Sequence, residues 1–159
     1  PERTIKETIG KSLLLDMIAG QSSDLYKELL DSGLINDTFS TEYFNGHGYA
    51  TPMFSGESLD PKRVAALIDE KINEFKLKGF SDEEFEIVRK KHYGKTVRAF
   101  TDVDTIANGL VVSYFENDDV FSEFKVLQEI TADYCYELLK NSFDNDKAVL
   151  SVITPKEIW

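Results

Sequence analysis

The sequence is poor in cysteine and has no long apolar run. Cys135 is the only cysteine among 159 residues, which excludes an internal disulfide and a paired-cysteine metal site. No stretch approaches the roughly 20 apolar residues that a membrane-spanning helix needs, since Asp16 interrupts the run LLLDMIAG. The opening residues PERT lead into an amphipathic stretch rather than a signal peptide. These absences predict a cytoplasmic protein without a membrane segment.

Positive charge is also scarce. Lysine and arginine number 18 against 29 acidic residues, so the formal net charge is −11. Nucleic-acid binding requires clustered cations that contact phosphates, and this charge balance argues against it. The one basic run, RKK at 89–91, follows the acidic run DEE at 82–84 on one expected helix, an order that suits the helix dipole. We interpret the basic run as a solvated helix face and expect no nucleic-acid partner.

Histidine is too rare for a hydrolytic zinc site. Such a site needs several protein ligands and a general base, but the sequence has only His47 and His92, outside any His-x-x-Glu-His motif. We interpret His92 as an ordinary helix histidine, and His47, in a glycine-rich turn, as a candidate contact residue. Cys135, on an apolar helix face, is expected to be a buried and unreactive thiol. We therefore predict no metal ligand and no catalytic residue in this chain.

Hydrophobic periodicity and capping signals predict several helices and one hairpin. Apolar residues recur at helical spacing from Ile5, and the period changes to two between Ile35 and Phe44. A turn cluster at 45–48 then joins two antiparallel strands. Capping signals begin the later helices, and a β-branched run before Pro155 predicts a final buried strand. The expected helices cover 5–19, 22–33, 61–79, 81 to beyond 92, 104–114, 121–127 and 131–139, and the expected strands cover 35–44, 49–57 and 148–154.

Residues 13–44 carry a specific order of these signals. A Leu-rich helix ends at Gly20, the residues SSDL at 22–25 begin a second short helix, and Gly33-Leu34 ends it before a strand. This order resembles the pitrilysin-type (inverzincin) zinc metallopeptidases. The resemblance is to the non-catalytic C-terminal half-domain, and it is similar to the bacterial two-subunit branch of the family. Further segments resemble the family as well, namely the helix at Pro61, the junction at 79–84, the helix start at 130–133 and the closing strand before Pro155.

The resemblance implies an α+β fold, with an antiparallel sheet and helices packed on one face, as in a half-domain of mitochondrial processing peptidase. Half-domains of the family have further strands before the Leu-rich helix, and this chain begins with Pro1 rather than methionine. We therefore expect residues 1–159 to form a single domain, the C-terminal part of a non-catalytic half-domain truncated at its N-terminus. The zinc ion is expected in the missing catalytic half, and no cofactor is expected in this fragment.

The resemblance also marks two functional positions. In family members built from two halves, the half without zinc donates an arginine and a tyrosine to the substrate. Leu30 and Asn36 stand in those places here; a leucine has no donor for a developing oxyanion, and an asparagine has only a short amide. We take Leu30, Asn36, Tyr43 and His47 as candidates for lining the substrate chamber.

Three functions follow from these observations. The first is a non-catalytic domain of a bacterial zinc metallopeptidase, which helps form the peptide-binding chamber and the subunit interface. Its partners would be the upstream catalytic half-domain, or a homologous partner subunit, and a peptide substrate. The second is a catalytically inactive scaffold protein of the same fold. The third is an unrelated acidic α+β interaction module.

Overall fold

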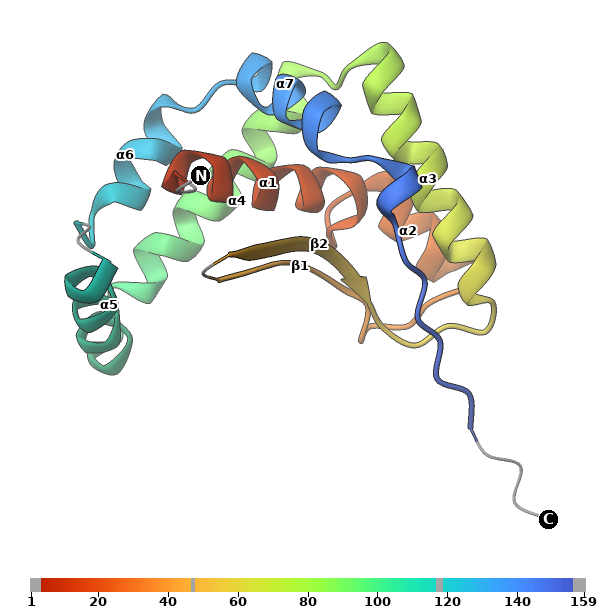
Figure 1. Ribbon diagram of the computed structural model, residues 1–159, viewed down its shortest axis with the longest axis horizontal. Helices are drawn as coiled ribbons and strands as arrows, with labels where there is room; N and C mark the ends of the chain where they lie inside the picture. Colours follow the sequence, from red (N-terminus) through yellow and green to blue (C-terminus); the bar gives the residue numbers. More distant parts are fainter. Residues whose placement is uncertain (1–3, 47, 117–118, 156–159) are drawn as a thin grey trace.

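The computed structural model describes residues 4–46, 48–116 and 119–155. Within these residues the chain forms helices that cover one face of an antiparallel hairpin, an α+β architecture (Figure 1). The elements are, in chain order, α1 Ile5–Ala19, α2 Asp24–Asp31, β1 Ser40–Gly46, β2 Tyr49–Ser55, α3 Pro61–Lys78, α4 Asp82–Ala99, α5 Val103–Glu116, α6 Ser122–Glu129, α7 Ala132–Ser142 and the 3₁₀ turn η1 Asn145–Lys147.

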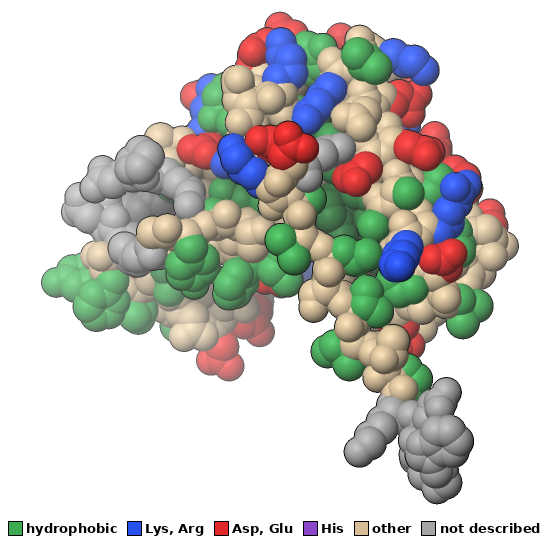
Figure 2. All heavy atoms as spheres, turned by 45° about the vertical axis from the view of Figure 1, so that its right-hand side comes forward, with side chains coloured by type: hydrophobic (Ala, Val, Ile, Leu, Met, Phe, Trp, Pro, Cys, Tyr) green, Lys and Arg blue, Asp and Glu red, His purple; other side chains and the backbone are tan. Residues whose placement is uncertain are grey.

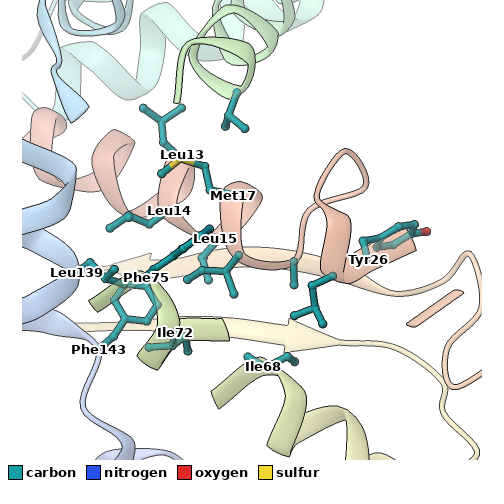
Figure 3. Close-up of a cluster of buried hydrophobic side chains, with 14 of the residues drawn as sticks. Leu13, Leu14, Leu15, Met17, Tyr26, Ile68, Ile72, Phe75, Leu139 and Phe143 are labelled. Atoms are coloured by element: carbon teal, nitrogen blue, oxygen red, sulfur yellow. The ribbon is translucent and has the colours of Figure 1, made fainter. Parts of the chain in front are cut away.

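Helix α1 is the centre of the fold. It contacts both strands and the helices α2, α3, α4, α6 and α7, and its second half, residues 13–19, is apolar on all sides except at Asp16, as expected for a helix segment that is buried on most sides. Leu13, Leu14 and Ile18 are fully buried. Figure 3 shows Leu14 of α1 close to Phe75 of α3 and Leu139 of α7. The core is therefore one cluster that packs the first helix, α1, against α7, the last.

The predicted capping signals act as expected. The Ser81 hydroxyl accepts a hydrogen bond from the Glu84 backbone N–H at 3.1 Å, and the Glu84 carboxylate accepts from the Ser81 N–H at 2.8 Å, which completes a capping box. Asp60 caps α3 in front of Pro61, and Thr131 caps α7. Each cap satisfies N–H groups that a helix start leaves without partners, which explains why these helix starts are readable from the sequence.

The hairpin presents one face to the helices and one to the outside. β1 and β2 pair in an antiparallel register, with Tyr43 opposite Pro52 and Phe44 opposite Thr51. Residues alternate between the two faces of a strand, so Tyr43 is buried against α1 while Phe44 is 46% exposed. Helices on one face of an antiparallel sheet are the predicted arrangement, which the structure confirms.

The predicted buried strand at 148–154 is wrong for this chain. The segment is irregular, and Val149 and Ile153 are more than 90% exposed. Figure 1 shows it running away from the helices at the C-terminal end. Among the described residues, β1 and β2 pair only with each other, so the segment has no strand partner. A β-branched run becomes a strand only where another strand satisfies its backbone groups.

Candidate functional site

The candidate chamber residues that the structure describes lie on three different segments. Leu30 lies on α2 with 41% of its side chain exposed. Asn36 follows Gly33, whose φ of 71° ends the turn after α2. Tyr43 lies on β1, facing the helices. His47 falls outside the described residues. Their role in a substrate chamber therefore stays a prediction.

The polar groups of Asn36 are used within its own loop. Its side-chain carbonyl accepts hydrogen bonds from the backbone N–H of Thr38, at 3.0 Å, and from the Thr38 hydroxyl. Its amide donates to a carboxylate oxygen of Glu57 at 2.8 Å. These bonds tie the start of the hairpin to its end, where Ile35 also bridges to Ser58. Asn36 thus holds the loop in place, and the Leu30 side chain offers no hydrogen-bond donor.

Tyr43 is anchored on the covered face of the hairpin. Its hydroxyl accepts a hydrogen bond from the Lys11 ammonium at 3.3 Å, and the same ammonium lies 5.3 Å from the ring centroid. Lys11 also forms an ion pair with Glu7, one turn earlier on α1. Only 8% of Tyr43 is exposed, so this tyrosine links β1 to α1.

The outward side of the hairpin forms a surface that the sequence reasoning did not single out. We call it the open face, defined by Glu42, Phe44, Tyr49, Thr51 and Met53. The register places all five residues on the same side of the two strands. The rings of Phe44 and Tyr49 lie 5.5 Å apart, and both are about half exposed. The sequence carried a signal for this surface, because Phe44, Tyr49 and Met53 occupy alternate strand positions on the side opposite Tyr43.

A second feature missed from the sequence is a buried carboxylate. Asp16 interrupts the apolar run of α1, and its side chain is 13% exposed. One carboxylate oxygen lies 2.9 Å from His92 Nε2 and 3.1 Å from Lys91 Nζ, both on α4. The other oxygen accepts from the Thr41 hydroxyl of β1 at 3.4 Å. Asp16 therefore joins α1, α4 and the hairpin.

The surroundings of Asp16 fix its ionised form. Burial alone would raise the pKa of its carboxyl group, but the hydrogen bond from His92 and the charge of Lys91 together hold that pKa well below the ordinary value of 3.8. A carboxylate held by two basic side chains is a poor general base, because it gives up these interactions when it takes a proton. The cluster is suited to cross-linking the fold rather than to proton transfer.

The Cys135 thiol and the possible metal-binding side chains also offer little catalytic chemistry. Cys135 is fully buried on α7, and burial raises the pKa of its thiol to about 12, which leaves it protonated at neutral pH. Among the described residues, no group of three or more histidine, cysteine, aspartate or glutamate side chains could hold a metal ion.

No helix in the described part of the chain is long and apolar enough to cross a membrane.

Comparison with known proteins identifies similar chains. A family model described as "Peptidase M16 inactive domain" matches residues 1–92. The "Uncharacterized zinc protease YmfH" of Bacillus subtilis is 26% identical over 155 residues, which cover 96% of this chain and 35% of that protein. The crystal structure of a putative M16-like peptidase from Alicyclobacillus acidocaldarius superposes with a TM-score of 0.81 at 24% identity, covering 86% of this chain and 33% of the other. The last likeness shows the fold, and the chain spans about a third of the length of both relatives.

Proposed function

Because the chain belongs to the family of M16 peptidase inactive domains, we propose that it is a non-catalytic domain of a bacterial zinc metallopeptidase that helps form its peptide-binding chamber and subunit interface. The family match confirms the resemblance to the pitrilysin-type peptidases. It also excludes the third alternative, an unrelated acidic interaction module. On this proposal, zinc and the general base belong to a catalytic half that this chain does not contain.

The observation that carries the chamber proposal is the open face of the hairpin. Helices cover the other face, but Phe44, Tyr49 and Met53 remain between 36% and 51% exposed in a row on two paired strands. Flat apolar side chains on a rigid sheet suit contact with an extended peptide, whose own side chains alternate at the same spacing. Glu42 adds a negative charge at this face for basic peptide residues.

The C-terminal segment supports the proposal of a partner. Residues 148–154 are apolar, β-branched and exposed, and the hairpin has only two strands within the described residues. A two-stranded hairpin and a lone extended segment both leave backbone hydrogen-bonding groups without strand partners. We propose that the further strands expected before the Leu-rich helix in half-domains of this family complete this sheet, and that the catalytic half-domain or a homologous subunit packs beside it. We keep a cytoplasmic location as part of the proposal, since a single buried cysteine needs no oxidising compartment.

The chamber proposal can be tested by peptide cleavage in the complete peptidase. The assembly would combine this domain with its catalytic half, and the change would be Phe44→Ser with Met53→Ser. We expect the KM for short peptides to rise by about tenfold, because apolar contacts to the bound peptide are lost. The value of kcat and the zinc content should stay nearly unchanged, since on this proposal the metal ligands belong to the catalytic half and the two substitutions remove only apolar contacts. The matched control is Leu77→Ser, which replaces an exposed leucine on α3.

Equal kinetics for the open-face variant and the control would contradict a chamber role. A second candidate function, an inactive scaffold of the same fold, is favoured by the two family positions, where Leu30 has no donor and Asn36 is bonded to Thr38 and Glu57. It predicts a stable complex with the partner that binds no zinc and cleaves no peptide. Metal analysis of the complete assembly separates these two functions.

A further inference from the structure

Helix α5 exposes most of its apolar surface. None of its described side chains is buried. The exposed fractions are 78% for Val103, 52% for Leu110, 82% for Tyr114 and 81% for Phe115. Figure 1 shows α5 protruding at one edge of the molecule, and Figure 2 shows hydrophobic side chains gathered at that edge. A helix this apolar is normally buried, so the isolated chain leaves a face that a partner would cover.

Four of the exposed residues line one side of α5, and Val111 and Phe115 extend the apolar surface beside them. Val103, Ala107, Leu110 and Tyr114 are spaced by four, three and four residues, which places them along one side of a helix. This spacing is the seam by which one helix packs along another. We call these four residues the α5 stripe. Its geometry fits a second helix better than an extended strand, because a strand would follow only part of the seam.

The inner side of α5 is only loosely filled. Ile106, Gly109 and Ser113 point toward the body and are partly buried. An open cleft of about 620 Å³ lies between α5 and the helices α1, α4 and α6, with His92 and Thr96 among the residues that line it. The inner side of α5 therefore contacts the body through only a few side chains.

Charge selects the kind of partner. Asp102 and Asp104 lie at the N-terminal end of the α5 stripe, and Asp104 forms no ion pair with another described residue. A second copy of this chain would bring its own net charge of −11 to the interface, and the two copies would repel each other. A helix with lysine or arginine beside its apolar seam would instead place cations near these carboxylates.

We propose that the α5 stripe docks an amphipathic helix of a partner polypeptide, one that carries basic residues along the edge of its apolar seam. This interface is separate from the open face of the hairpin. The proposal does not depend on the chamber role, because it rests on the exposure, spacing and charge of α5 alone.

The test uses the full chain and a synthetic peptide probe. The probe is a fluorescein-labelled helix of about three heptads with Leu at the a and d positions and Lys at e and g. Binding is followed by fluorescence anisotropy at low salt. We expect saturable binding that weakens by about tenfold or more in the double variant Leu110→Ser, Tyr114→Ser, because central apolar anchors dominate helix docking. The control double variant Leu77→Ser, Ile87→Ser removes exposed apolar residues from α3 and α4 and should bind as the original chain does.

Two further measurements separate the role of charge from that of folding. The single variant Asp104→Asn should weaken binding of the Lys probe several-fold and leave the helix content seen by circular dichroism unchanged. A probe with Glu in place of Lys should bind more weakly than the Lys probe. The proposal is overturned if the stripe variants bind as the control does, or if both probes bind equally. It is also overturned if sedimentation shows a dimer that Tyr114→Ser dissociates, since a second copy then covers the stripe.

Discussion

The two faces of the β1–β2 hairpin are built from neighbouring residues yet serve different ends. On the covered face, Tyr43 is 8% exposed, bonded to Lys11 and packed under α1. On the open face, Phe44, the next residue along the strand, is 46% exposed and contacts only Tyr49 among the aromatic rings of the described residues. Strand alternation thus separates a side that stabilises the domain from a side that stays exposed, and our proposal assigns the exposed side to peptide contact.

The largest predicted effect distinguishes these two neighbours. Tyr43→Ala should lower the free energy of unfolding by about 3 kcal/mol, because it empties a buried aromatic site. Phe44→Ala should change that free energy by less than about 0.5–1 kcal/mol, since half of its ring already contacts water. Urea unfolding of both variants measures the difference. Similar losses for the two would mean that the open face is as much a part of the core as the covered face.

The second prediction concerns the carboxylate that supports the covered face. Asp16→Asn should cost about 2–3 kcal/mol at pH 7, because His92 and Lys91 lose their charged partner in a poorly hydrated site. The folded-state pKa of Asp16 lies below its ordinary value, so its ionised form stabilises the fold at pH values above about 4 and is lost as the pH falls further.

The difference in free energy of unfolding between Asp16→Asn and the original chain should therefore shrink as the pH falls from about 5 to about 2, the window that the lowered pKa of Asp16 defines. Urea unfolding at several pH values measures this difference. The control is Asp69→Asn on α3, which replaces an aspartate that forms no ion pair with α4. A difference that stays constant down to the lowest pH would show that the ionisation of Asp16 does not support the fold.

The smallest of these predictions concerns the Lys11 contact. Lys11→Met keeps much of the apolar stem, which packs beside Tyr43, but removes the hydrogen bond to the Tyr43 hydroxyl at 3.3 Å together with the partly exposed ion pair to Glu7, whose contribution is small. We expect a loss of about 1 kcal/mol, the ordinary contribution of one such bond. The double variant with Tyr43→Phe should lose little more than the single variant. Additive losses would indicate that the two side chains act independently.

Much of the fold could be predicted because its signals are local. The capping box of Ser81 and Glu84 and the Asp60-Pro61 helix start depend on residues within one turn of each other. The hairpin was likewise indicated by the change to period two and by its turn. These features form with little help from the rest of the chain, so a single sequence is enough to find them.

Other features depended on distant partners. The segment at 148–154 has the composition of a strand, but composition does not supply the neighbouring strand that would satisfy its backbone. Asp16 looked like an interruption in an apolar helix, and only the fold brings His92, 76 positions away, to its carboxylate. The resemblance marked Leu30 and Asn36 by position, yet the bonds from Asn36 to Thr38 and Glu57 follow from the loop that closes the hairpin.

Site-specific photocrosslinking tests the central claim most directly. A benzophenone amino acid would replace Phe44 on the open face or, as the control, Leu77 on α3, in the complete peptidase with its catalytic half. A biotin-labelled substrate peptide is then added and irradiated. The account predicts a crosslink from position 44 that excess unlabelled peptide abolishes, and none from position 77. Equal crosslinking at both positions, or none at position 44 while the assembly cleaves the same peptide, would contradict it.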